Sequence, residues 1–482
     1  MSAVPILPGF HPDPTICRVG DEYFLATSSF EYFPGVPIRR STDLTAWEQI
    51  GNVLDRPSQL VVSRGAEGAS RGIYAPTLRH HDGLFWLVTT NVDEIQRGHL
   101  IVHATDPAGP WSDPVYTQGT IGIDPDLAWD DDGECFLTWK DPMAGGIAQV
   151  RVDPLTGELL GQPRILTTGT GLAHAEGPHL IRRGDWWYLV TAEGGTHTGH
   201  VVSVARSRSI EGPFEPHPEP ILTHRSTSDP VQATGHADMF ELADGSWAMV
   251  HLGIRQRGSF PRWHVNGRET FLVGIDWIDD WPVVREDRFE VAGGETSFED
   301  TFDDAKLGPR WIAPGIDPHA FALVSAAGLT LRPGRQPGAS EAVHLLGVRA
   351  TDPEWQASVA ARGDLALLVR IDDAHWAGVQ RVGGVLTARA VVGPLQQELG
   401  SAEVPVEARL ALRAVLPQTQ YGERSGPDRI DLGYVTDDFH PVASIDGRYV
   451  STEVAGGFTG RIIGIEALGD DDAVVTSFRY DA

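Results

Sequence analysis

Cysteine is scarce in this chain, since Cys17 and Cys135 are the only two among 482 residues. Two cysteines cannot form a disulfide framework, and because both stand in apolar, strand-like runs we expect buried free thiols. No run of about 18 uninterrupted apolar residues occurs, which excludes a membrane-spanning helix. The first residues lack the basic stretch and apolar run of a secretory signal. We therefore expect a cytoplasmic protein with no membrane partner.

Basic residues are also few, with 38 Lys and Arg against 66 Asp and Glu and a net charge of −28. This balance argues against nucleic acid as a partner, because no basic surface is available to displace counterions from phosphates. Methionine occurs only four times, whereas 54 Gly and 34 Pro favour many turns and a β-rich chain over long helices. The length predicts two or three domains.

One pattern occurs five times in the first half of the chain. Each copy reads as a short strand, a tight turn ending in Gly and an aromatic-rich strand, and a second hairpin-like unit follows several copies. Four strands per unit, at about 50 residues per unit, are typical of a β-propeller blade. The alternative is an irregular β-sandwich whose strands merely resemble each other. The copies are DPTICRVGDEYFLATS from Asp13, APTLRHHDGLFWLVTT from Ala75, DPDLAWDDDGECFLTW from Asp124, GPHLIRRGDWWYLVTA from Gly177 and HADMFELADGSWAMVHL from His236.

The pattern stops at an acidic, Gly-containing stretch, EVAGGETSFEDTFDD, which we interpret as a linker. Beyond it, segments such as QASVAAR, LALLVRI and DRIDLGYV alternate apolar and polar residues between turns, as half-buried antiparallel strands do. We therefore predict an all-β protein. A five-bladed β-propeller catalytic domain occupies residues 1–290, and a β-sandwich of jelly-roll type occupies residues 298–482.

In a propeller the first strand of each blade lines a central channel, so the aligned Asp13, Asp124 and His236 should meet there. Glu176 comes one residue before the aligned position of its own copy. A single Asp here could cap a turn before Pro, and the set could hold a structural cation. Glycoside hydrolysis, however, needs one protonated and one ionised carboxyl group. A further carboxylate beside the acid raises the pKa of that acid and keeps it protonated, because two neighbouring negative charges repel each other.

Several ordered motifs carry a resemblance: GFHPDPTICRVGDEYFLATSSFEYFPGVPI, followed by GIDPDL, HAEGPHL, TAEGGT, ATGHADM and GRETFL. With them the chain resembles glycoside hydrolase family 43, in particular its β-xylosidases and α-L-arabinofuranosidases that carry a C-terminal β-sandwich. The resemblance implies an inverting hydrolase with Asp13 as general base, Glu176 as general acid and Asp124 tuning the pKa of the acid. It implies no required cofactor, although some relatives hold Ca²⁺ near the residue that corresponds to His236.

The resemblance also implies a sugar-binding set, which comprises Phe30, Tyr74, His236, Arg268 and Phe458. Phe30 corresponds to an aromatic residue that lines the sugar pocket, and Arg268 to an arginine that contacts the sugar. Tyr74 departs from the family pattern, because GIYAP stands where these β-xylosidases typically have GIWAP. Phe458 belongs to a segment expected to reach over the propeller mouth, and the alternative places it in the sandwich core.

The expected activity is release of xylose from the non-reducing end of β-1,4-xylo-oligosaccharides. The alternative enzyme is an α-L-arabinofuranosidase, and the alternative of another class is a non-catalytic carbohydrate-binding propeller. The expected partner is a small oligosaccharide, and a homo-oligomer is compatible with the sequence.

Overall fold

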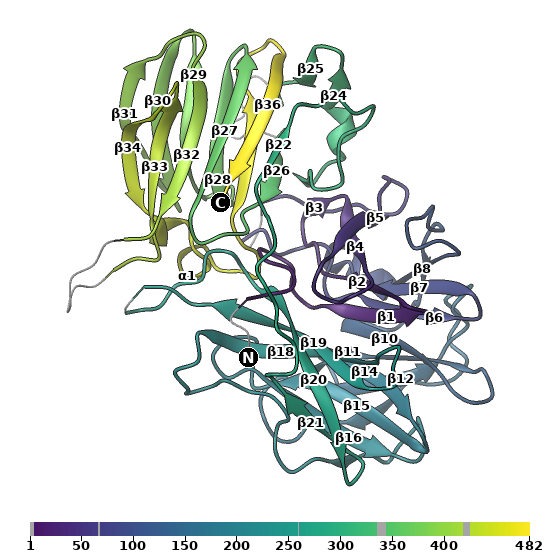
Figure 1. The fold of residues 1–482 in the computed structure, drawn as a ribbon. Coiled ribbons are helices and arrows are strands. Elements are labelled where there is room, and N and C mark those ends of the chain that lie inside the picture. Colours follow the sequence, from purple (N-terminus) through teal and green to yellow (C-terminus); the bar gives the residue numbers. More distant parts are fainter. Residues whose placement is uncertain (1–3, 66–67, 259, 335–343, 418–424) are drawn as a thin grey trace.

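The computed structural model describes residues 4–65, 68–258, 260–334, 344–417 and 425–482, and residue 1, the predicted start of the first domain, lies outside them. The chain forms two β-rich regions, drawn in purple to teal and in green to yellow in Figure 1. No helix in the described ranges is long and apolar enough to cross a membrane. Cys17 and Cys135 are both free and buried, as expected.

Within the described residues, the first region contains five four-stranded antiparallel sheets, and each repeated sequence pattern forms the first two strands of one sheet. Tight glycine turns join these strands, as at Gly20, where φ is +62°. The sheet that starts the chain contains β1 (Thr15–Val19), β2 (Glu22–Ala26), β4 (Gly35–Ser41) and β5 (Glu48–Leu54). The next contains β6 (Thr77–His81), β7 (Leu84–Thr89), β8 (Leu100–Ala104) and β9 (Val115–Tyr116).

The other three sheets repeat this arrangement of strands in chain order. One contains β10 (Ile123–Trp129), β11 (Cys135–Asp141), β12 (Gly146–Arg151) and β13 (Arg164–Thr167). Another contains β14 (Glu176–Arg183), β15 (Trp186–Glu193), β16 (Val201–Ser207) and β17 (Glu215–Pro216). The last contains β18 (Val231–Glu241), β19 (Trp247–Arg255), β20 (Glu269–Ile278) and β21 (Trp281–Arg285).

The first strands of these sheets contact one another in a closed ring. β1 contacts β6, β6 contacts β10, β10 contacts β14, β14 contacts β18, and β18 returns to β1. Apolar side chains fill the spaces between successive sheets, as where Phe24 of the first sheet packs on Phe85 of the next with ring centroids 5.0 Å apart. Inward-facing positions of distant segments therefore meet around one axis.

The second region is a β-sandwich, and its strands alternate as the sequence predicts: Leu365, Leu367 and Val369 of β28 all point into its apolar core. The predicted sandwich is confirmed, whereas its jelly-roll connectivity stays a prediction. The larger sheet contains β22 (Phe298–Asp300), β24 (Ala322–Ser325), β25 (Gly328–Leu331), β27 (Trp355–Arg362), β32 (Arg409–Val415), β33 (Arg429–Val435), β34 (Phe439–Asp446) and β36 (Ala473–Asp481). The smaller sheet contains β26 (Leu346–Arg349), β28 (Leu365–Asp372), β29 (His375–Val382), β30 (Val385–Val392), β31 (Leu395–Glu403) and β35 (Ile462–Ala467).

Helices are short in the described residues, which accords with the β-rich prediction. The last strand of the first region ends at Arg285 and the first strand of the second begins at Phe298, and the domain limits at residues 290 and 298 stay predictions. The helices are the 3₁₀ turns η1 (Val92–Arg97), η2 (Pro318–Ala320) and η3 (Gly447–Val450) and the α-helix α1 (Thr452–Ala455).

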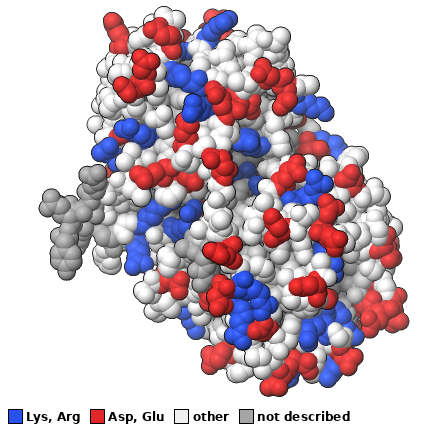
Figure 2. Space-filling view, in the orientation of Figure 1, with Lys and Arg blue, Asp and Glu red and all other residues white. Residues whose placement is uncertain are grey.

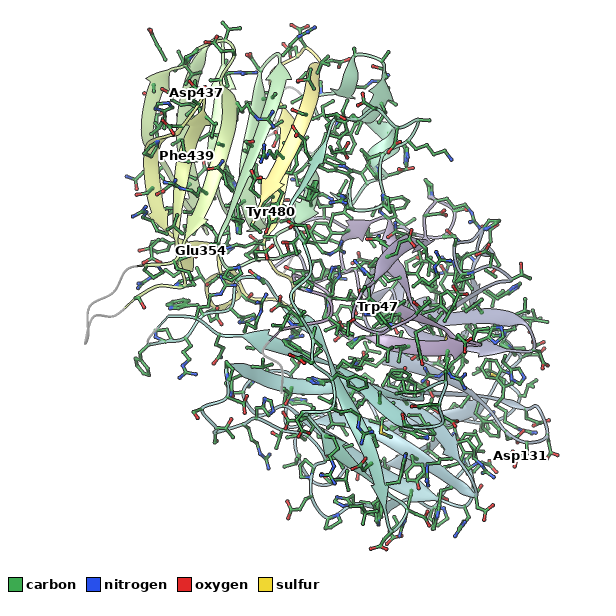
Figure 3. All side chains as sticks on the ribbon, viewed as in Figure 1. Trp47, Asp131, Glu354, Asp437, Phe439 and Tyr480 are labelled. Atoms are coloured by element: carbon green, nitrogen blue, oxygen red, sulfur yellow. The ribbon has the colours of Figure 1, made fainter. Side chains whose placement is uncertain are left out.

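Several contacts join the two regions. β3 (Tyr32–Phe33) of the first region pairs with β23 (Ala313–Pro314). The Arg370 guanidinium donates to Glu31 Oε1 at 3.2 Å, with both side chains almost fully buried. Arg255 of the first region donates to the Thr351 carbonyl at 3.2 Å. Within the second region, Tyr480, labelled in Figure 3 on β36 near the junction, donates its hydroxyl to the adjacent Asp352 at 3.0 Å. Acidic and basic side chains are interspersed over the face of both regions seen in Figure 2.

Candidate active site

The aligned positions of the repeats share an unusual backbone conformation. Four of them have left-handed φ values: 53° at Asp13, 55° at Asp124, 56° at Gly177 and 50° at His236. The strand pairing shifts register next to the last three of these residues. A left-handed conformation at a non-glycine residue costs on the order of 1–3 kcal/mol and is concentrated at functional sites. The repeated strain therefore marks one end of the ring of strands as a candidate site.

His236 lies at the centre of the carboxylates in this site. Its Nε2 atom is 3.5 Å from Asp124 Oδ2, which also accepts a hydrogen bond from the Gly177 N–H at 3.1 Å. Burial lowers the pKa of His236, but the charges of Asp13, Asp124 and Glu176 outweigh burial and raise this pKa to about 9. His236 is therefore an imidazolium at neutral pH. A Cβ added to Gly177 would lie 2.9 Å from Nε2, so this position requires glycine.

The two carboxyl groups beside His236 have opposite pKa shifts. Burial raises the pKa of Glu176, and the negative charge of Asp124 raises it further, against the opposing effect of Lys140. Burial would also raise the pKa of Asp124, but its hydrogen bond with His236 and the imidazolium charge outweigh burial and lower that pKa. One carboxyl group is thus favoured in the protonated form and its neighbour in the ionised form.

Asp13 stands at the start of the first sheet, just before β1, with 8% of its surface exposed. The Ser28 hydroxyl donates to Asp13 Oδ2 at 2.5 Å and fixes the carboxylate. Within the described residues the second oxygen, Oδ1, accepts no hydrogen bond, so it can accept one from water. The charges of Asp13 and Glu176 both act on His236 and on the buried Arg268. These two carboxyl groups, on different sheets, therefore lie near the same two cationic side chains.

Aromatic side chains lie beside Arg268 in this site. The ring of Phe30 lies with its centroid 5.5 Å from Tyr74 and 6.0 Å from Phe458. The Arg268 guanidinium lies over the Phe458 ring, 4.6 Å from its centroid, and donates to the Thr196 carbonyl at 3.0 Å. The structure therefore brings together all eight residues that the sequence singled out: Asp13, Phe30, Tyr74, Asp124, Glu176, His236, Arg268 and Phe458.

Phe458 comes from the second region and is not part of the sandwich core. Its backbone N–H donates to Ser70 Oγ at 2.7 Å, and Thr459 donates its hydroxyl to the Gly68 carbonyl at 3.1 Å. A Cβ at Gly68 would lie 2.4 Å from the Gly456 carbonyl, so the two backbones touch. The segment 456–460 is thereby fixed against the loop before Tyr74. The part of that loop at residues 66–67 lies outside the described residues.

Comparison with known proteins identifies the chain. The profile described as Glycosyl hydrolases family 43 matches residues 2–282. The chain belongs to glycoside hydrolase family 43. A second profile, described as Beta xylosidase C-terminal Concanavalin A-like domain, matches residues 299–481.

Relatives in family 43 have names of both glycosidase types. The chain is 35% identical to the "Non-reducing end alpha-L-arabinofuranosidase BoGH43B" of Bacteroides ovatus, over 99% of this chain and 93% of that protein. It is 45% identical to a "Xylosidase/arabinosidase" of Butyrivibrio fibrisolvens, over 58% of this chain and 56% of the relative. The solved xylan β-1,4-xylosidase of Bacillus halodurans is 28% identical over 99% of both chains, with a TM-score of 0.86. This chain is therefore similar to xylosidases and to arabinofuranosidases.

Sequence reasoning missed Lys140, which lies in this family 43 site. Lys140 is near the end of β11, and its Nζ atom donates to Glu176 Oε2 at 3.1 Å. Both side chains are 15% exposed. The sequence around Lys140 does not mark it as a site residue, because a single Lys at a strand end is usually exposed to solvent. Only the neighbouring sheet, which carries Glu176, places the carboxyl group against it.

A second layer of polar residues below the site was also missed. Two residues after the aligned positions, the repeats carry a set of polar residues from different sheets that contact one another, as where the Thr15 hydroxyl donates to Asp238 at 2.9 Å. Arg79 donates to Asp238 at 2.7 Å and to Asp126 at 2.8 Å, and these two carboxylates are almost fully buried. The alignment of the repeats could have identified this set, because its members occupy the same position in all five copies. The set comprises Thr15, Thr77, Asp126, His179 and Asp238.

The resemblance to family 43 allows a Ca²⁺ ion near His236. Within the described ranges of the chain, no group of three or more His, Cys, Asp or Glu side chains is arranged to hold a metal ion. Because Ca²⁺ also accepts backbone carbonyl and water oxygens as ligands, a Ca²⁺ ion near His236 stays a prediction.

Proposed function

We propose that this family 43 chain is an exo-acting, inverting β-xylosidase that releases xylose from the non-reducing end of short β-1,4-xylo-oligosaccharides. The observation that carries the proposal is the pair of opposite pKa shifts around His236, raised at Glu176 and lowered at Asp124. Neighbouring carboxyl groups with separated pKa values are the arrangement that acid–base glycoside hydrolysis requires.

Each carboxyl group has a distinct role in the proposed reaction. Glu176 is protonated and donates its proton to the glycosidic oxygen as the bond to the leaving sugar breaks. Asp13, held by Ser28 with Oδ1 open, takes a proton from the water that attacks the anomeric carbon from the opposite face. A single displacement of this kind inverts the anomeric configuration. Asp124 remains ionised, favours the protonated form of Glu176 and holds His236 in place.

The cluster of aromatic rings formed by Phe30, Tyr74 and Phe458 supports exo action. We infer that the five sheets are the blades of a five-bladed propeller and that the site lies at one end of its channel. Phe458, supplied by the second region, closes that end together with Phe30 and Tyr74. A site closed on one side accepts a chain end and not the middle of a polymer.

A second candidate is an α-L-arabinofuranosidase. Two observations favour it: the relative of this name matches over 99% of this chain, and Tyr74 stands where the family's β-xylosidases typically have Trp. The non-catalytic alternative is disfavoured, because a protein that only binds sugar has no need of a carboxyl group kept protonated beside an ionised one.

Side-by-side assays with nitrophenyl β-xyloside and nitrophenyl α-arabinofuranoside test the proposal. A larger kcat/KM for the xyloside supports the xylosidase, a larger value for the arabinofuranoside supports the second candidate, and no hydrolysis of either contradicts both. The sugar released from xylobiose should first appear as the α-anomer in NMR spectra. Early appearance of the β-anomer would contradict the single displacement.

We further propose that hydrolysis needs no cofactor. Because Glu176, Asp13 and Asp124 supply the proton transfers themselves, activity should persist after exhaustive dialysis against a chelator. Loss of activity on dialysis that Ca²⁺ restores would place a cation in the reaction.

A further inference from the structure

A cavity of about 500 Å³ lies on the outer face of the smaller sandwich sheet, away from the catalytic carboxylates. Side chains of β28 alternate, so Leu367 and Val369 enter the sandwich core, whereas Leu368 and Arg370 face the cavity. Arg64 of the first region forms part of another wall. The cavity therefore lies at the junction of the two regions, a common position for ligand sites.

The cavity contains side chains whose binding groups are unused within the described part of the chain. Trp376 is half-buried, yet its ring contacts no other aromatic ring or guanidinium there, and its indole N–H donates no hydrogen bond. The side-chain amides of Gln380 and Gln396 also lack hydrogen bonds to described residues. By contrast, the half-buried Trp186 lies under the Arg208 guanidinium, 3.6 Å from its ring centroid.

These three side chains share one face of the sheet. Trp376 and Gln380 stand four residues apart on β29, so they point to the same side. Trp376 pairs with Val391 of β30, which in turn pairs with Gln396 of β31. A flat apolar ring and two amides are thus presented together, which suits a sugar: the ring covers the apolar face of a pyranose, and the amides bind its hydroxyls.

The charges that line the cavity balance. Three arginines, Arg64, Arg370 and Arg389, are matched by three carboxylates, Asp373, Glu398 and Glu466. Arg64 binds Asp373 through two nitrogens, at 2.9 and 2.8 Å, so these charges are already paired. In a chain with a net charge of −28, a neutral lining disfavours both anionic and cationic ligands. A neutral polyhydroxylated ligand fits these observations.

We propose that this cavity is a second carbohydrate-binding site, separate from the catalytic pocket, which holds a neutral segment of an oligosaccharide or polysaccharide. Trp376 stacks on a sugar ring, and Gln380 and Gln396 bind its hydroxyl groups. Arg370 connects the site to the catalytic pocket, because it binds Glu31, the neighbour of Phe30 in the sequence. A chain held here is kept beside the junction that carries the pocket wall. Only the choice of a xylan probe rests on the proposed function.

Affinity electrophoresis of the full chain tests the site. All proteins carry Glu176→Gln to prevent hydrolysis, and they migrate through gels with increasing concentrations of soluble, uncharged arabinoxylan. Because losing an aromatic contact and its buried area costs about 1.4 kcal/mol, Trp376→Ala should weaken the apparent dissociation constant about ten-fold. Gln380→Ala should weaken it by a smaller factor. Trp186→Ala, a matched control, should migrate like the parent.

Unchanged retardation in both Trp376→Ala and Gln380→Ala would overturn the proposal. The melting curve shows whether Trp376→Ala is folded. If it is not, the retardation of Gln380→Ala alone tests the proposal. If Trp376→Ala in the otherwise native chain loses nitrophenyl-glycoside hydrolysis in proportion to its lost binding, the cavity belongs to the catalytic pocket, and the proposal is wrong. Retardation measures binding alone. A chain that hydrolyses neither nitrophenyl glycoside would therefore contradict the proposed function without affecting this result.

Discussion

Replacing Glu176 by Gln separates the general acid from the other carboxyl groups by means of the leaving group. A xylose leaving group is a poor one and depends on the proton that Glu176 supplies. Nitrophenol has a low pKa, so its anion is a stable leaving group that departs with little help from an acid. We therefore expect Glu176→Gln to impair cleavage of xylobiose far more than cleavage of nitrophenyl xyloside.

The structure allows the size of this effect to be worked out. The amide oxygen of Gln can still accept the hydrogen bond that Lys140 donates to Glu176 at 3.1 Å, so the fold should lose little. The lost function is proton donation, and general acid assistance is worth about 10²–10⁴-fold. At about 1.36 kcal/mol for each factor of ten, the barrier for xylobiose should rise by roughly 2.7–5.4 kcal/mol.

The assay compares kcat/KM for both substrates in native enzyme, Glu176→Gln and Asp13→Asn. Asp13→Asn is the matched control, because it also replaces a carboxylate by an amide but removes the base that both substrates need. It should reduce both activities by similar factors. Melting curves check that each variant is folded.

Equal losses on both substrates for Glu176→Gln would show that this residue is not the general acid. A larger loss on the nitrophenyl substrate would have the same meaning, since a proton donor cannot matter most where the leaving group needs it least.

Four further predictions concern the pH profile, the pocket wall and the channel. Asp124→Asn removes the negative charge that raises the pKa of Glu176, so the alkaline limb of the kcat/KM profile should move to lower pH; an unmoved limb would contradict this electrostatic role. Lys140→Met should move the same limb to higher pH, because the ammonium lowers that pKa, and Lys140→Arg should restore it. Phe458→Ala should raise KM with little change in melting temperature, whereas the opposite pattern would place this side chain in the sandwich core. Arg79→Met leaves two buried aspartates unpaired and should lower the free energy of unfolding by about 3–5 kcal/mol in urea titrations, and a loss below about 1 kcal/mol would disprove the pairing.

The strands, the repeated hairpins and the catalytic candidates could all be predicted from the amino-acid sequence. These features depend on local physics, namely period-two alternation, glycine turns and the equivalence of repeated segments. Because equivalent positions occupy equivalent places in a ring of sheets, the alignment alone selected Asp13, Asp124 and His236 across 223 positions of sequence. The left-handed φ at all three is the structural counterpart of that equivalence.

The sequence did not reveal the groups that act from neighbouring sheets. Lys140 approaches Glu176 because β11 of one sheet packs beside β14 of the next, and no local pattern indicates which side chain spans that gap. Arg79 reaches across the channel to carboxylates on two other sheets for the same reason.

The contacts between the two regions became visible only in the folded protein. The Phe458 N–H binds Ser70 across 388 positions of sequence, and the Gly68 backbone touches the same segment. Trp376 becomes part of a cavity because Arg64 of the first region forms another of its walls. Contacts of this kind depend on the relative position of two packed bodies, which side-chain periodicity within either body does not encode.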